Sequence, residues 1–554
     1  DVMIALRKPD DVMRLDRLGS LHGSRLSFLR ILLRRIQVER WSFERTAFEI
    51  GADCTGHAVY TAHTPDRAYS LVVFAHQLDP EHRTDRVIAN AWDSTFTLFD
   101  GIPTDADIDR LRCQVPLQEA GRLSPSELTM SRANKSVRLW DALVSTLASG
   151  EQPATELIDE TGYLMRTTAV YGSGKFGACD REMILDRPEL QPAVQAEMLT
   201  VLMIRQFARN WLEYEAYLRA PGQAVRLDDT LATRLGIGNS TGLGMAPFLI
   251  NHPVLIDHWM RARETAIARV AAIREVMDTD RALVMRLINR QRNEFKLWRS
   301  SDETQSEAII DLTQDLGVLA DWFGSSPSNQ ALWAEAMQFA ATSLCFEAQE
   351  VLASVMLEPY AELVDSLASE MAVDESELRP VNGALTVAES IAQIDRQYHW
   401  LDDIHWKRAD ATALLWYVSE EKLEPRLGVR NEDAFEVHEQ PLAPARDITA
   451  YRQALNSWSP ETTLAEFLMR EPEHRLAAMR VQWIAANQYG EIRGNTIDAS
   501  LRPIDLLRCK LSFFGATRFD PRSDRWLRIT LYRHAPYLDQ VVEMDPFWVY
   551  GPVQ

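Results

Sequence analysis

Cysteines are few in this chain, and no two of them lie close together. Five occur among 554 residues, at positions 54, 113, 179, 345 and 509. An odd number without any CxxC spacing argues against a disulfide framework and against a structural zinc site built from thiolates. We therefore expect a reducing compartment and predict a cytoplasmic protein.

The chain also lacks long apolar runs and an excess of positive charge. No apolar stretch approaches the roughly 20 residues that a membrane span requires. Residues 1–4 do not have the pattern of a secretory signal, and because they lack an initiator methionine we expect native residues before them. The net charge of −21 repels a phosphate backbone, so we expect no nucleic-acid partner.

Composition is that of a folded protein, with 46% hydrophobic and 25% charged residues. Because single cores stop growing near about 250–300 residues, a chain of this length favours several domains or layers. We predict an α+β, predominantly α-helical fold with an N-terminal antiparallel β-meander, large central helical layers, and a C-terminal helix plus β-hairpin. The expected segments are residues 1–122, 123–427 and 428–554, with a linker at 428–447.

The meander is predicted from runs of β-branched and aromatic residues that alternate with turn residues. Such runs cover residues 41–50, 57–63, 69–78 and 87–99. A strand is also predicted over residues 164–171, and a C-terminal hairpin over 510–519 and 526–534 around a turn at 520–523.

Helices are predicted from apolar periodicity and from capping residues. Ser124 with Glu127 has the spacing of a capping box and predicts a helix over residues 124–149, and Thr386 with Glu389 predicts another helix start. Further helices are expected over residues 189–218, 247–298 and 473–487, and an almost continuous helical stretch over 303–423.

The first candidate site is a glycine-rich segment that follows the predicted strand at 164–171. It contains G-x-G-x-x-G, and its candidate binding residues are Gly172, Ser173, Gly174, Lys175 and Gly177. No βαβ unit surrounds it, which argues against a dinucleotide site, and Phe176 stands where a P-loop needs Ser or Thr. An anion cradle of backbone amides with Lys175 remains, and the alternative is a plain turn.

The second candidate site is the stretch 236–244, which we interpret as a glycine-rich loop before a helix. Its candidate binding residues are Gly238, Asn239, Ser240, Thr241 and Gly242, with His252 just beyond as a candidate acid or base. A helix N-terminus at this position favours an anion. The alternative is a tight connection without a ligand.

A third candidate lies on the helix predicted over residues 387–406. At helical spacing, Asp395, His399, Asp402 and Trp406 share one face. An acid–histidine–acid series can orient a general base or hold a metal ion. It can equally be a hydrogen-bonded network or a solvated face.

The fourth candidate is a group of arginines in the C-terminal hairpin. Such side chains can bind an anion through paired hydrogen bonds, or can form ion pairs with Asp520 and Asp524 nearby. The arginines are Arg518, Arg522, Arg525, Arg528 and Arg533.

Together these features predict a cytoplasmic enzyme that acts on a small anionic metabolite, a carboxylate or a phosphate, held by the glycine-rich loops. As catalytic residues, Lys175 would neutralise substrate charge, His399 with Asp402 would transfer protons, and His252 is a further candidate acid or base. The alternative is a non-catalytic helical scaffold or a regulatory protein-interaction module. Neither a cofactor nor a metal is identified by these motifs, and self-association into a homo-oligomer stays open.

Overall fold

The computed structural model describes residues 5–14, 17, 24–77, 92–116, 124–172, 184, 186–192, 194–241, 253–299, 303–325, 328–372, 381–407, 444–492, 513–515, 518–523, 526–543 and 545–550. For 168–172, 239–241, 304–305, 444, 518–523 and 526–528 it describes the backbone alone.

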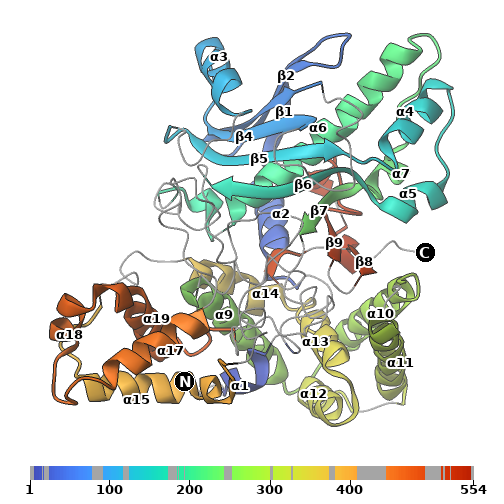
Figure 1. Cartoon of the computed structure of the whole chain (residues 1–554). Coiled ribbons are helices and arrows are strands. Elements are labelled where there is room, and N and C mark those ends of the chain that lie inside the picture. Colours follow the sequence, from blue (N-terminus) through green and yellow to red (C-terminus); the bar gives the residue numbers. More distant parts are fainter. Residues whose placement is uncertain are drawn as a thin grey trace. The chain divides into compact units, whose positions relative to one another are not determined.

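The chain forms two compact units, each assembled from three separate stretches (Figure 1). Unit 1 contains residues 1–20, 242–276 and 328–510, and unit 2 contains residues 21–241, 277–327 and 511–554. Sequence analysis predicted three consecutive segments instead. Turn and linker residues mark breaks along a chain, but they carry no information about which distant stretches pack together.

Unit 2 is built on a nine-stranded sheet with the order β1-β2-β3-β4-β5-β6-β7-β9-β8. Its strands are β1 (Ser42–Ile50), β2 (Gly56–His63), β3 (Ala68–Ala75), β4 (Ser94–Asp100), β5 (Glu127–Lys135), β6 (Tyr163–Gly172), β7 (Gly236–Thr241), β8 (Arg518–Ser523) and β9 (Trp526–Leu531). Neighbouring strands are antiparallel except β6 and β7, which are parallel. The predicted N-terminal meander is confirmed, and the C-terminal hairpin joins the same sheet through β7.

A long helix, α6 (Gln195–Arg219), packs against the strands of this sheet (Figure 1). Phe207 of α6 makes edge-to-face contacts with Tyr60 of β2 and Phe96 of β4. Val72, Phe74 and other apolar side chains form a smaller cluster with Leu111 of α3 (Asp105–Gln114). Tyr60 and Phe96 pair in register with Leu71 and Val73 of β3, so alternate residues of β3 face opposite sides of the sheet.

Unit 2 also contains several other helices. α2 (Phe28–Val38) and α4 (Trp140–Ala148) both contact α6, while α10 (Asp278–Phe295) and α11 (Glu303–Gly324) pair with each other. The short helices are α5 (Thr155–Thr161), α7 (Asp229–Thr233), and the 3-10 turns η3 (Pro188–Leu190), η9 (Val541–Glu543) and η10 (Trp548–Tyr550).

The named elements in the described part of unit 1 are helices, which gives the whole protein a mixed α+β and mostly helical character, as predicted. One group of helices is α1 (Pro9–Val12), α9 (Pro253–Ala271), α12 (Leu332–Ser343), α13 (Phe346–Val355), α14 (Ala361–Val364) and the 3-10 turn η4 (Asp365–Met371). The second group, which we call the C-terminal bundle, shares an apolar core of its own. Its elements are α15 (Val387–Gln397), η6 (His399–Asp403), α17 (Pro444–Leu455), α18 (Leu464–Arg470), η8 (Pro472–His474) and α19 (Arg475–Ala486).

The helix predicted over residues 124–149 is wrong in its first half. Ser124 and Glu127 do hydrogen-bond, with Ser124 Oγ donating to Glu127 Oε2 at 2.8 Å, but they form a turn that leads into β5. Strand β5 lies in the middle of the sheet, where β4 and β6 satisfy its backbone on both sides. Tertiary pairing therefore overrides the local capping signal, and the helix α4 begins only at Trp140.

Three other predicted elements also differ. The stretch 236–241 is the strand β7 rather than a loop, and the hairpin turn lies between Ser523 and Trp526 rather than at 520–523. The helix predicted over 247–298 is broken between α9 and α10. Glu275 there forms a β-bridge with Gln330, and Val276 N donates to Asn329 O, so the backbone leaves the helix to pair with a distant segment.

Candidate functional site

The parallel pair β6–β7 brings the two glycine-containing segments to one end of the sheet. The register pairs Tyr163 with Gly236 and Thr167 with Asn239, so both strands run the same way. Gly172 ends β6 and Thr241 ends β7. Parallel strands leave a sheet at the same end, and we call this the Gly172–Thr241 end.

The C-terminal hairpin turns at the same end. Thr241 pairs with Leu527 of β9, and Ser523 pairs with Trp526, so the turn lies beyond the last residues of β7. Arg528, which pairs with Ser240, is therefore placed by its backbone beside the Gly172–Thr241 end. Arg533, by contrast, lies past the other end of β9, where its guanidinium donates to Asp159 Oδ1 at 2.6 Å.

Acidic side chains near this end already have basic or hydroxyl partners. Strand β4 ends at Asp100, which pairs in register with Tyr69 of β3 and forms an ion pair with Arg187. Tyr69 Oη donates a hydrogen bond to the Glu189 carboxylate, and burial together with this carboxylate raises the pKa of Tyr69 above its usual range.

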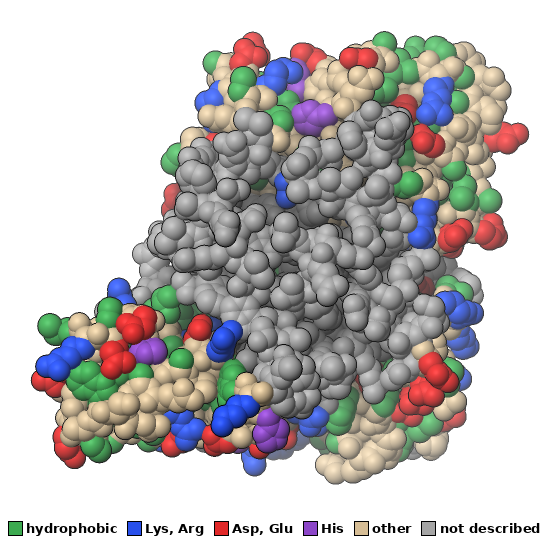
Figure 2. Space-filling view, in the orientation of Figure 1, with side chains coloured by type: hydrophobic (Ala, Val, Ile, Leu, Met, Phe, Trp, Pro, Cys, Tyr) green, Lys and Arg blue, Asp and Glu red, His purple; other side chains and the backbone are tan. Residues whose placement is uncertain are grey.

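The first residue of β5, Glu127, is an acid that likewise has a basic partner. Glu127 is fully buried and accepts a hydrogen bond from Arg110 Nη2 at 2.7 Å. The Glu189 carboxylate also forms an ion pair with Arg67, whose Nε lies 3.7 Å from Glu189 Oε1. The negative charges at this end are thus offset locally, which matters in a chain of net charge −21. Over the described part of one face, Figure 2 shows acidic and basic side chains interspersed.

The structure places some of the predicted binding residues and leaves others outside its description. Gly172 is the last residue of β6, and four further candidates lie in β7. These four are Gly238, Asn239, Ser240 and Thr241. Ser173, Gly174, Lys175, Gly177, Gly242 and His252 lie outside the described residues.

The acid–histidine–acid face predicted around His399 does not form on one helix. Helix α15 ends at Gln397, and the 3-10 turn η6 follows, so the 3.6-residue spacing is lost. Arg452 of α17 instead joins the two carboxylates, at 2.6 Å from Asp395 and 2.7 Å from Asp402. His399 is exposed, and it belongs with Asp402 to unit 1. A catalytic role for His399 and Asp402 stays a prediction.

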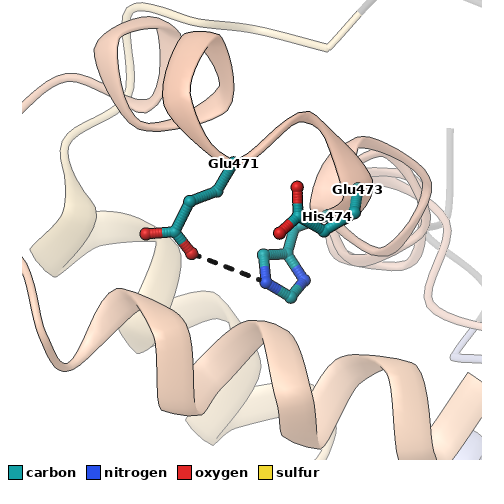
Figure 3. Close-up of side chains that lie close together, drawn as sticks. All are labelled: Glu471, Glu473 and His474. Atoms are coloured by element: carbon teal, nitrogen blue, oxygen red, sulfur yellow. Dashed lines mark ion pairs between the residues drawn. The ribbon is translucent and has the colours of Figure 1, made fainter.

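A group of metal-ligand side chains that sequence analysis missed lies in the C-terminal bundle. Glu471, Glu473 and His474 each offer a ligand atom, and these atoms lie within 4.8 Å of one another (Figure 3). Among the residues that the structure describes, this is the group of His, Cys, Asp or Glu close enough to hold a metal ion. The signal in the sequence was the run Glu-Pro-Glu-His, in which the acids and the histidine are almost adjacent.

Comparisons were made with protein-family models, with curated proteins and with solved structures. Nothing matches this chain in any of them. Function is therefore inferred from the geometry of the sites themselves, as it must be even where a fold is known. Within the described ranges, no helix combines the length and the apolar content needed to cross a bilayer.

Proposed function

We propose that the chain is a cytoplasmic enzyme that acts on a small anionic metabolite, a carboxylate or a phosphate, bound at the Gly172–Thr241 end of the sheet. One observation carries this proposal. The parallel pairing of β6 and β7 brings the ends of two glycine-containing segments, far apart in the sequence, to the same place.

The end of adjacent parallel strands is a favourable place for an anion. The ladder of hydrogen bonds stops there, so backbone N–H groups become available, and ligands in α/β sheets bind outside the carboxyl ends of strands for this reason. Gly172 supports such an approach because it carries no side chain. The paired states of Asp100, Glu127 and Glu189 reduce the repulsion that an incoming anion would meet.

Basic side chains supply the attraction in this proposal. Arg528 is brought to this end by the register of β9 with β7. Lys175 follows β6 by three residues in the sequence and is proposed to neutralise substrate charge. His252 is retained as a candidate acid or base, but like His399 it belongs to the other compact unit. The roles predicted for His399 and Asp402 are separate, because these residues belong to the other compact unit.

The proposal of a cytoplasmic location is supported by the state of the thiols. Cys54 and Cys113, both in the described part of the chain, are free thiols. Free thiols are typical of proteins in a reducing compartment.

The test is a thermal-shift screen of the full chain with inorganic phosphate, succinate and citrate as probes. We expect at least one probe to raise the melting temperature in a concentration-dependent way. Lys175→Gln and Arg528→Gln should each weaken its binding by about tenfold to 100-fold, since a hydrogen bond to a charged group contributes about 1.5–3 kcal/mol. Arg226→Gln is the matched control, because Arg226 is exposed in the same unit.

Two results would overturn the proposal in different ways. If none of the probes binds, or if both variants bind as the wild type does, the anion site is refuted and the scaffold alternative gains support. If a related anion binds but a mass-spectrometric search for its conversion finds none, the site is a binding site and the enzymatic part is refuted.

A further inference from the structure

The connection between α18 and α19 gathers three side chains that ligate metals. Helix α18 ends at Arg470, helix α19 begins at Arg475, and the 3-10 turn η8 lies between them. The tight turn brings Glu473 and His474 next to Glu471, and Figure 3 shows the three side chains converging on one small region. We call these three residues the Glu471–His474 cluster.

Neighbouring aromatic side chains hold two members of this cluster in place. Trp458 Nε1 donates to Glu471 Oε1 at 2.6 Å, which fixes that carboxylate and leaves its other oxygen, Oε2, facing His474. The His474 ring stacks on the Phe467 ring at a centroid distance of 5.9 Å, and the Tyr451 ring lies equally close. The donor atoms are thus oriented before any ligand arrives, which lowers the cost of binding.

The distance between the ligand atoms of Glu471 and His474 suits two ligands of one metal ion better than it suits a direct hydrogen bond between these side chains. His474 Nε2 lies 3.7 Å from Glu471 Oε2, longer than an N–H···O hydrogen bond. Two ligands of a tetrahedral zinc ion, each about 2.0–2.2 Å from the metal, lie about 3.4 Å apart. The observed separation is close to this value, so a small shift of either side chain would complete the geometry.

We propose that the Glu471–His474 cluster binds a divalent transition-metal ion such as Zn²⁺. One imidazole and two carboxylates are ligands that zinc accepts, whereas an imidazole is a poor ligand for Mg²⁺ or Ca²⁺. Two carboxylates also balance the charge of a divalent cation. Because Glu473 is exposed and the protein supplies three ligands, the fourth position is open to water or to a small ligand.

Trp458 is a positioning residue in this proposal. Its indole N–H occupies one oxygen of Glu471 and directs the other toward the metal position. Partners of this kind typically change metal affinity by about tenfold to 100-fold when they are removed. Trp458→Phe removes the indole donor and keeps an aromatic ring next to Phe467, whose ring centroid lies 5.5 Å from that of Trp458.

The experiment uses the full chain, stripped with a chelator and dialysed. Zn²⁺ is titrated by calorimetry, and Co²⁺ is added separately because its visible absorption reports a four- or five-coordinate site. The variants are Glu471→Gln, Glu473→Gln and His474→Gln, with Glu461→Gln as the control, since Glu461 is an exposed acid of the same bundle. Glu473→Gln changes an exposed side chain, so it tests the site without risk to the core.

We expect the wild type and Glu461→Gln to bind one Zn²⁺ that the three cluster variants bind at least about tenfold more weakly. The Co²⁺ absorption should disappear with the same variants, and Trp458→Phe should weaken binding while circular dichroism stays unchanged. The proposal is overturned if the wild type binds no stoichiometric Zn²⁺, or if Glu473→Gln and His474→Gln bind it as tightly as the control does. Either result is independent of anion binding at the Gly172–Thr241 end.

Discussion

A Cβ atom at Gly238 would lie 2.8 Å from Cγ of the Tyr163 ring. Tyr163 is buried in β6, and its ring covers the backbone of β7 at this point. Gly236 is equally confined, because a Cβ atom there would collide with the carbonyl oxygen of Leu531 in β9. Close packing between strands therefore accounts for both glycines without a ligand, and the predicted contact of Gly238 with substrate stays a prediction.

Replacing Gly238 with alanine should destabilise the sheet. The added methyl group must displace a buried ring, and overpacking of this kind costs about 1–3 kcal/mol. We expect faster hydrogen exchange in β6 and β7 and a lower unfolding midpoint in urea. Gly222→Ala is the control, because a Cβ atom at Gly222 meets nothing within 4 Å. Equal stability of the two variants would contradict the close contact.

The strands and caps that depend on neighbouring residues could be predicted from the sequence. The alternation and turns of residues 41–63 predicted β1 and β2, and the spacing of Thr386 and Glu389 predicted the start of α15, where the capping box is present. Such patterns act within one or two turns of chain, so no distant partner is needed to identify them.

The features that depend on contacts between residues far apart in the sequence could not be predicted. The parallel register of β6 with β7 joins residues about 70 positions apart, and local periodicity does not specify it. Arg452 lies 50 positions from Asp402 in the sequence, yet its guanidinium donates a hydrogen bond to the Asp402 carboxylate. In the candidate metal site, the short spacing of Glu471 and His474 was visible in the sequence, but the orientation of Glu471 by Trp458 was not.

The carboxyl group of Asp447 makes stability depend on pH. It is half-buried in α17, and burial raises its pKa from 3.8 to about 6, although Arg480 and Arg446 oppose this. The folded state therefore holds the proton more tightly than the unfolded state, and this contribution is present below pH 4 and is lost as the pH rises to about 6.

Asp447→Asn should accordingly stabilise the C-terminal bundle at pH 7 and have little effect at pH 4. After allowance for solvent screening, the expected gain at pH 7 is about 1–3 kcal/mol. Hydrogen exchange of amides in α17 and α19 at both pH values would measure it. The exposed Asp403, changed to Asn, should show no such dependence. A gain that is equal at the two pH values would rule out the raised pKa as its cause.

Two arginines that bind carboxylates in the C-terminal bundle, Arg480 and Arg452, should differ in their effect on stability. Arg480 donates to both oxygens of Glu491, at 2.7 and 2.6 Å, and Tyr398 Oη donates to the same carboxylate at 2.8 Å. This group is buried, so Arg480→Met leaves an uncompensated charge and should cost about 3–5 kcal/mol. Arg452→Met breaks partly exposed pairs and should cost no more than about 1 kcal/mol.

Arg480→Met and Arg452→Met would be compared by thermal unfolding and by hydrogen exchange of the amides in α15 and α19. Both substitutions remove one arginine from the same bundle, so each serves as the control for the other. Similar destabilisation by the two variants would mean that burial does not decide the strength of these pairs.

The last prediction concerns Arg205 of α6, whose guanidinium binds backbone carbonyls rather than a carboxylate. Its Nε donates to Leu235 O at 2.7 Å, Nη1 to Pro536 O at 2.9 Å and Nη2 to Ala535 O at 2.7 Å. The cation also lies 3.9 Å from the centroid of the Tyr537 ring. Burial lowers the pKa of Arg205, but an arginine remains charged at neutral pH, so these carbonyls and the ring are what stabilise the charge.

Arg205→Lys should therefore release the segment 535–538 from α6 while the charge is kept. An ammonium group cannot reach three carbonyls in the plane that a guanidinium spans, and each buried carbonyl left without a donor costs about 1–3 kcal/mol. Hydrogen exchange of Leu538, whose N–H donates to Gln206 Oε1 at 3.2 Å, should become faster well before the strands of the sheet exchange. Arg226→Lys, at an exposed position, should leave this exchange unchanged. Unchanged protection of Leu538 in Arg205→Lys would show that charge alone, and not the planar set of donors, holds this segment.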